Sequence, residues 1–123
     1  MKFLNTTDFA IMQKSLDAMW VRQRVIGDNI ANHETPGYKA KYVEFENLLR
    51  TRIDGIRSGR VSTANFGASI RTDISTTARV DGNNVDMDKE QLELARTKLQ
   101  YDYMTSMITS EFTRLRNAIR EGR

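Results

Sequence analysis

Each end of this chain of 123 residues carries the pattern of a long amphipathic helix, and no comparable core-forming segment lies between the two. Near the N-terminus, large apolar side chains recur at steps of three and four residues, interrupted at Gln23: Phe9, Met12, Leu16, Met19, Ile26 and Ile30. Near the C-terminus, one series has strict seven-residue spacing and a second widens it: Leu94, Tyr101, Ile108 and Leu115, then Met104, Phe112 and Ile119. Such a stripe is a seam that needs a facing partner. The predicted fold class is therefore mainly α, with the two terminal helices paired as an antiparallel coiled-coil-like hairpin around an irregular or small-β middle segment.

The composition limits how much core this hairpin can build. Only 39% of the residues are hydrophobic, and two helices sharing one seam make a thin core. We therefore expect a marginal or partly disordered monomer that neighbouring chains complete. The absence of cysteine excludes disulfides and thiolate chemistry. No apolar run approaches the ~20 residues that a membrane span needs.

The net charge of +3 is concentrated in the middle of the chain. Residues 1–49 and 85–123 are each balanced, whereas 50–84 carry six arginines against three aspartates. This surplus is typical of a solvated loop, and it is also compatible with a contact surface for an acidic neighbour.

Local signals divide the chain into 1–36, 37–84 and 85–123, within one structural unit. The first helix is expected to open at Thr7 or Asp8 and to reach about Asn32, because Pro36 disfavours helical backbone at the residue before it. Pro36 and Gly37 predict a type II turn with positive φ at the glycine. Within the helix, Gly27 is either a tolerated weak point or a place where another helix comes close.

The middle and last segments are read in the same way. The sequence predicts a short helix from about Val43 to Ile53 and possible strands within 69–74. It predicts turns at Asp81–Gly82 and Asn83–Asn84. The last helix should open after Val85, capped by Asp86 or by Asp88 with Gln91, and should run to about Ile119.

A search for chemistry finds no catalytic constellation, so the sequence predicts neither an enzyme nor a cofactor. His33 is the sole histidine and is expected to be a turn or cap residue. Asp81, Asn83 and Asp86 hint at a calcium loop but lack EF-hand spacing. Tyrosines near basic residues are a weak signature of single-strand nucleic-acid binding. The charge-balanced helices argue against that function.

The segment Asp28–Lys39 resembles the signature that ends the N-terminal helix in the bacterial flagellar rod and hook protein family. The matching residues are Asn29, Ile30, Ala31, Asn32, Thr35, Pro36, Gly37, Tyr38 and Lys39. Asp81–Glu90 and Phe112–Ile119 are similar to the start and the end of the C-terminal helix in proximal-rod members of that family. The polar Gln23 is a departure within the first seam.

This resemblance implies a structural subunit of the proximal rod. The terminal helices would pair and stack into the helical drive-shaft tube that links the membrane ring to the distal rod. The implied partners are other copies, other rod proteins, the membrane (MS) ring, the rod-base adaptor and the flagellar type III export apparatus, with no nucleic acid and no direct membrane span. The implied location is the periplasmic rod of the basal body. Export would need no cleaved signal peptide, in agreement with the lack of an apolar core in residues 1–7.

Three alternatives remain open at this level. The first is a helical-hairpin adaptor or chaperone acting outside the flagellum, which would not polymerise into tubes with rod subunits. The second is a basic nucleic-acid binder, which would bind DNA in a salt-dependent way. An enzyme is the third.

Overall fold

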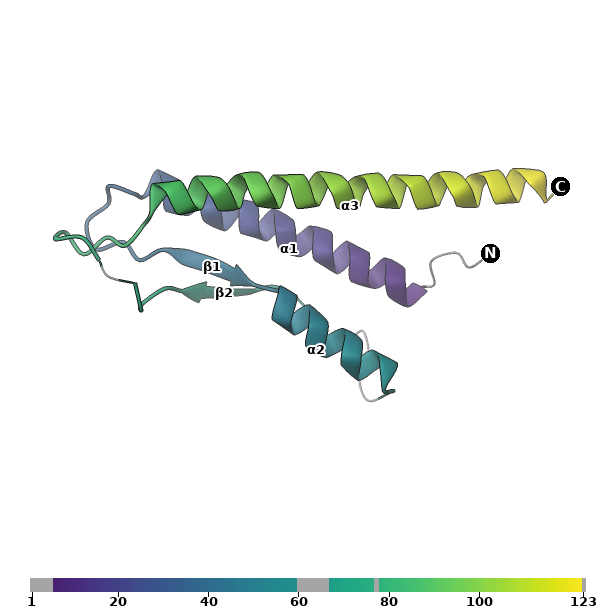
Figure 1. Cartoon of the computed structure of the whole chain (residues 1–123), viewed down its shortest axis with the longest axis horizontal. Coiled ribbons are helices and arrows are strands. Elements are labelled where there is room, and N and C mark those ends of the chain that lie inside the picture. The colour runs from purple at the N-terminus through teal and green to yellow at the C-terminus, as the bar shows by residue number, and fades with distance from the viewer. Residues whose placement is uncertain (1–5, 60–66, 77, 123) are drawn as a thin grey trace.

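The computed structural model describes residues 6–59, 67–76 and 78–122. Two long helices dominate it (Figure 1). The elements along the chain are α1 Thr6–Ala31, β1 Lys41–Glu44, α2 Glu46–Arg57, β2 Ser69–Thr72 and α3 Met87–Glu121. In Figure 1, α1 lies between α3 and a third layer made of the two strands and α2. The start of α1 and the end of α3 lie toward one end of the molecule, and residues 32–40 and 78–86 gather at the other (Figure 1).

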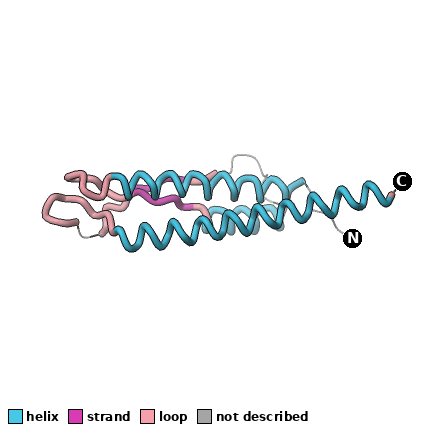
Figure 2. Tube along the Cα trace, turned by 90° about the horizontal axis from the view of Figure 1, so that it is seen from above, coloured by secondary structure: helices cyan, strands magenta, loops and turns pink. Residues whose placement is uncertain are grey.

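The helices α1 and α3 run side by side in opposite directions (Figure 2). Near the loop end, the Nδ2 atom of Asn29 donates a hydrogen bond of 3.1 Å to Oε2 of Glu90. Near the chain ends, the rings of Phe9 and Phe112 meet edge to face, with centroids 5.6 Å apart. The prediction of an antiparallel pair of terminal helices is confirmed.

The buried apolar core lies on the other side of α1, against the strands. It consists of Ala18 and Val25 from α1 and of Val43 and Phe45 from the segment at β1, with Val21, Leu49 and Ala68 packed around them. One face of α1 therefore meets α3, and another meets the layer formed by β1, β2 and α2. Because α1 is the middle layer, it carries apolar side chains on more than the single stripe read from the sequence.

The two strands form a two-stranded antiparallel sheet in which Val43 pairs with Ile70, although α2 lies between them in the chain. The outer edge of β1 is covered by polar side chains of α1. The carboxamide of Asn29 bonds both backbone groups of Lys41, at 2.6 Å to the oxygen and 3.0 Å from the nitrogen. Arg22 donates to the carbonyl oxygen of Val43 at 3.0 Å. These bonds protect an edge that could otherwise pair with another chain.

The structure confirms α1, the strand within 69–74 and the long last helix, it decides between the two predicted caps of that helix, and it corrects two finer predictions. The short helix starts at Glu46 rather than Val43, because Val43 is taken into β1. Asp86, not Asp88, caps α3, and its side chain accepts a bond from the backbone nitrogen of Lys89. Asn83–Asn84 does not form a turn but lies in irregular, buried backbone.

Candidate assembly interface

The loop end of the molecule holds a polar junction, which we define as residues 29–41 together with residues 79–90. Here the end of α1 and its following turn meet the segment that leads into α3 (Figure 1). Most of the signature between Asn29 and Lys39 faces the second segment across this junction. Three carboxamides hold it: Asn29, Asn83 and Asn84.

Asn29 is fully buried and uses every hydrogen-bonding position of its carboxamide. Its nitrogen donates to Lys41 O and to Glu90 Oε2. Its oxygen accepts from Lys41 N and, at 3.2 Å, from the Tyr38 hydroxyl. One side chain therefore connects α1 to β1, to α3 and to the turn between them.

Asn83 is also fully buried, and it bonds the segment that follows α1 from 51 residues away in the sequence. Its Nδ2 atom donates to the carbonyl oxygens of Asn32 and Thr35, each at 2.8 Å. Its Oδ1 atom accepts from Val85 N at 2.8 Å. Because α1 ends at Ala31, both carbonyls belong to the segment that follows the helix, and Asn83 ties this segment to the one that leads into α3.

Asn84 ties the strands to the same junction. Its Oδ1 atom accepts from Ala40 N at 2.6 Å, and its Nδ2 atom donates to Asp73 O at 2.7 Å. Asp73 in turn receives bonds from Ser75 and Thr76, which hold the pKa of its carboxyl well below the usual range. The carboxylate thereby fixes the bend that follows β2.

Two glycines let the turns of the junction approach each other. Gly37 has φ of 72° in a turn closed by the bond from Tyr38 N to Thr35 O, as the type II prediction requires. Gly82 has φ of 84°, and a Cβ on it would lie 3.3 Å from the Cα of Gly37. Gly37 N also donates to Asp81 O at 2.8 Å. A side chain on Gly82 would therefore push the two turns apart.

The remaining signature residues divide into contacting and exposed ones. Asn32 and Thr35 bond each other at 3.1 Å, and Lys39 donates to Gly82 O. Ala31 and Pro36 are exposed, and Ile30 is half-buried. His33 contacts the carbonyl oxygen of Ile30 through Nδ1 at 2.8 Å, which is the cap position expected for it.

The predicted seam is closed at the loop end and open at the other. Ile26 is buried. Eight members of the seam are half-buried: Met12, Leu16, Met19, Ile30, Leu94, Tyr101, Met104 and Ile108. The outer members are partly exposed: Phe9 at 39%, Phe112 at 52%, Leu115 at 40% and Ile119 at 60%. The monomer therefore leaves the C-terminal part of the stripe without full cover.

Two polar residues belong to the same stripe and were missed by the sequence analysis. Glu90 and Thr97 are buried, and both continue the three- and four-residue steps around Leu94. Burial raises the pKa of the Glu90 carboxyl, and the bond from Asn29 opposes that shift. The hydroxyl of Thr97 has no hydrogen-bond partner among the described residues. The sequence signal for them was that positions 90 and 97 fall on the three- and four-residue series but carry no apolar side chain.

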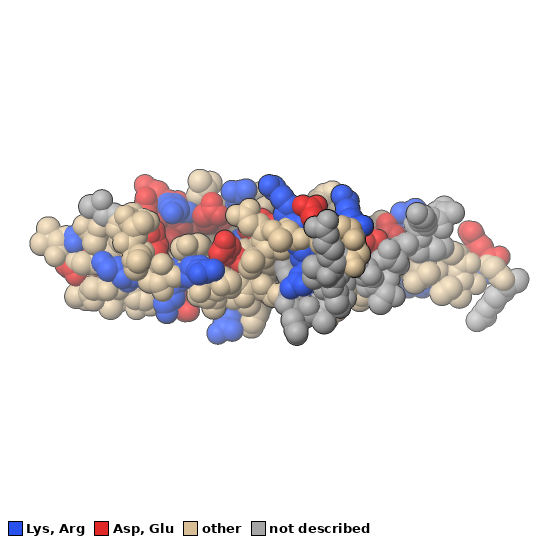
Figure 3. Space-filling view, turned by 90° about the horizontal axis from the view of Figure 1, so that it is seen from below, with Lys and Arg blue, Asp and Glu red and all other residues tan. Residues whose placement is uncertain are grey.

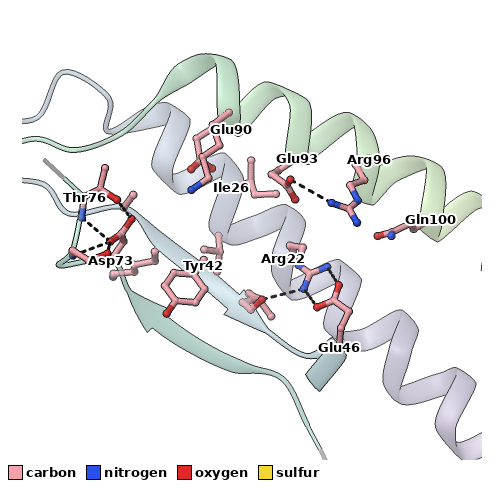
Figure 4. A pocket seen from close by; sticks show the side chains of 16 residues that line it. Arg22, Ile26, Tyr42, Glu46, Asp73, Thr76, Glu90, Glu93, Arg96 and Gln100 are labelled. Carbon is pink, nitrogen blue, oxygen red and sulfur yellow. Dashed lines mark hydrogen bonds and ion pairs between the residues drawn. The ribbon is translucent and has the colours of Figure 1, made fainter. Parts of the chain in front are cut away.

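An open groove of about 690 Å³ separates α3 from β1, with α1 at its floor (Figure 4). Two ion pairs line it. Arg22 holds both carboxylate oxygens of Glu46, at 2.6 and 2.7 Å, and this bond lowers the pKa of Glu46. Arg96 lies 3.8 Å from Glu93. Asp73 also lines the groove, where its carboxylate accepts hydrogen bonds from the hydroxyls of Ser75 and Thr76.

Other observations bear on the remaining functional classes. Over the described ranges, no three His, Cys, Asp or Glu side chains are grouped to hold a metal ion. Asp81, one member of the hinted calcium loop, accepts from Asn83 N instead. The space-filling view shows basic and acidic side chains interspersed rather than a continuous basic stripe on that face (Figure 3). None of the described helices is long and apolar enough to cross a membrane.

The fold and the junction together define a class of protein. Two terminal helices are locked at one end, and their apolar seam is left open at the other, as in a structural subunit completed by its neighbours.

Comparison with known proteins agrees with this class. The family model described as flagella basal body rod protein matches residues 16–39. The chain is 34% identical over 119 residues to the flagellar basal body rod protein FlgB of Bacillus subtilis, covering 91% of this chain and 92% of the relative. Identity is 30% over 125 residues to the protein of the same name from Escherichia coli, covering 89% and 91%. The FlgB protein of Borreliella burgdorferi is 30% identical over 121 residues, covering 85% and 88%. The chain belongs to the flagellar basal body rod protein family, whose members are structural.

Asn83→Ala should lower the free energy of unfolding by about 1–3 kcal/mol, because two carbonyls in the segment that follows α1 lose a buried donor. Urea unfolding followed by circular dichroism measures this change. Asn47→Ala, at an exposed position of α2, is the matched control and should shift stability by less than about 0.5 kcal/mol. Equal losses for the two variants would show that the bonds of Asn83 to the segment after α1 do not stabilise the fold.

Glu90→Gln should stabilise the protein increasingly as the pH rises. The pKa of Glu90 is raised in the folded state, so the unfolded chain loses this proton first. Stability is therefore lost as the pH rises from the ordinary pKa of a glutamate to the raised value. A glutamine keeps an acceptor for Asn29 and does not titrate. The difference in unfolding free energy between variant and parent should grow from pH 4 to pH 7. A difference that shrinks over this range would contradict the burial effect.

Proposed function

We propose that the chain is a structural subunit of the proximal rod in the flagellar basal body, and that it assembles through its terminal helices into the tube that links the membrane ring to the distal rod. The observation that carries this proposal is the open end of the seam. Phe112, Leu115 and Ile119 continue the stripe that faces α1, yet each stays at least 40% exposed. An apolar stripe on a helix is stabilised by a facing partner, and a neighbouring subunit supplies it.

The proposed partners follow from membership of the rod protein family. They are other copies of the chain and other rod proteins along the seam, with the membrane (MS) ring and the rod-base adaptor at the base of the rod. The flagellar type III export apparatus would carry the chain to the periplasmic part of the basal body without a cleaved signal peptide. A chain without cysteine is compatible with passage between reducing and oxidising compartments. No observation favours an adaptor or chaperone outside the flagellum.

Ile108→Asp and Leu115→Asp should each abolish motility while export continues. A carboxylate in an assembled apolar seam is desolvated without a partner, which is unfavourable by several kcal/mol. Export of an unfolded chain does not use the seam. Swimming in soft agar, recovery in isolated basal bodies and the exported amount are the three measurements.

Ser110→Asp is the matched control, because Ser110 is exposed and lies on the opposite side of α3 from Ile108. It should swim normally. Normal recovery of either seam variant in basal bodies would show that this stripe is not an assembly contact.

A further inference from the structure

The helix α3 carries a second apolar stripe that no described part of the chain covers. Leu92, Leu99 and Tyr103 are 67%, 71% and 67% exposed. They follow one another at seven and four residues, so they lie on one line along the helix. Leu99 and Tyr101 are two residues apart and point to opposite sides. The second stripe therefore faces away from α1, and we call it the outer stripe of α3.

The helix α1 has an exposed face with the same spacing. Trp20, Gly27 and Ala31 also follow one another at seven and four residues, and all three are exposed. Trp20 is 54% exposed, with the guanidinium of Arg24 lying 5.0 Å from its ring centroid. Gly27 would meet nothing within 4 Å if it carried a Cβ. We call these three residues the outer face of α1.

These two surfaces lie at matching heights along the molecule. The bond between Asn29 and Glu90 marks one level. Trp20 precedes Asn29 by nine residues, and Leu99 follows Glu90 by nine. Gly27 precedes Asn29 by two residues, and Leu92 follows Glu90 by two. Because the helices are antiparallel, Trp20 is level with Leu99 and Gly27 is level with Leu92.

Within one chain these residues cannot meet, because the outer stripe of α3 points away from α1. We propose that the outer stripe of α3 in one copy packs on the outer face of α1 in a second copy at the same level. This proposal rests on the proposed assembly function and adds a second contact to the seam. It sets Leu92 over Gly27, where a missing side chain leaves room for it. It sets Leu99 and Tyr103 on either side of the Trp20 ring.

Two arginines lie near this contact, Arg24 on α1 and Arg96 on α3. Arg96 lies close to the height of Arg24, but its guanidinium is directed into the groove beside Glu93 (Figure 4). The two surfaces are different, so the contact is head to tail. When two copies are in contact, one still exposes its outer stripe of α3 and the other its outer face of α1. Further copies can add at both, and repeating the contact generates a ring or a helix. A tube of rod subunits needs a contact of this kind.

Four double-cysteine variants test the proposal in assembled basal bodies. Trp20→Cys with Leu99→Cys and Gly27→Cys with Leu92→Cys are the matched pairs. Trp20→Cys with Leu92→Cys and Gly27→Cys with Leu99→Cys are the controls. The controls use the same four positions, but each pair is seven residues out of register, or about 10 Å along a helix. The chain has no cysteine of its own, so every disulfide comes from an introduced pair.

After mild oxidation, non-reducing electrophoresis should resolve ladders of linked copies for the matched pairs. The mismatched pairs should stay monomeric, because a disulfide needs Cβ atoms about 3.5–4.5 Å apart. Single-cysteine variants should also stay monomeric, since a head-to-tail contact does not bring a residue onto itself.

Two results would overturn the proposal while leaving the proposed function intact. One is recovery of all four variants in basal bodies with none of them cross-linked. The other is linkage of the matched pairs only to a different protein, identified by its mass. If the parent chain itself is absent from basal bodies, the proposed function fails first, so the two failures are distinguishable.

Discussion

The arrangement of the two long helices depends on buried carboxamides at one end of the molecule. Asn29 and Asn83 are fully buried and together bond α1, its following turn, β1 and the start of α3. Away from this junction, the ring contact between Phe9 and Phe112 is exposed in part. The junction therefore sets the relative position of the helices. The seam beyond it adds apolar contacts to a pairing that the junction has already positioned.

A carboxamide is suited to this task because it is neutral and can both donate and accept. A satisfied polar network in a buried site is directional, so it specifies one geometry where an apolar contact would tolerate several. Glu90 is the exception within the network, since burial acts against its charge and raises its pKa. The junction thus combines precise geometry with limited hydrophobic stabilisation. That combination fits a subunit that gains most of its stability on assembly.

The features that depend on residues close together in the sequence were predicted correctly. The periodic stripes predicted both helices, and Pro36 with Gly37 predicted a turn with positive φ that the structure contains. The role of Asn83 could not be read, because its partners lie 51 and 48 residues away. An Asn–Asn pair read locally is a turn signal. The position of Val43 could not be read for the same reason: it pairs with the distant Ile70 in the sheet and therefore does not belong to the predicted helix.

The predicted set of assembly residues was incomplete because only one apolar stripe was read on each helix. Reading one apolar stripe per helix passed over Glu90 and Thr97, whose polar side chains are buried within it. It also passed over Leu92 and Leu99, which belong to a separate line on α3. A helix that contacts more than one neighbour carries more than one stripe, and a search for a single period finds the strongest of them.

Amide hydrogen exchange on the confirmed monomer tests most directly whether the junction organises the fold. The backbone amides of Ala40, Lys41 and Val85 each donate to a buried asparagine side chain. They should exchange as slowly as the centre of α1, and protection should fall along α3 toward its C-terminal end, where the seam is open. Rapid exchange at these three amides, or uniform strong protection through residues 9–30 and 94–119, would contradict the account.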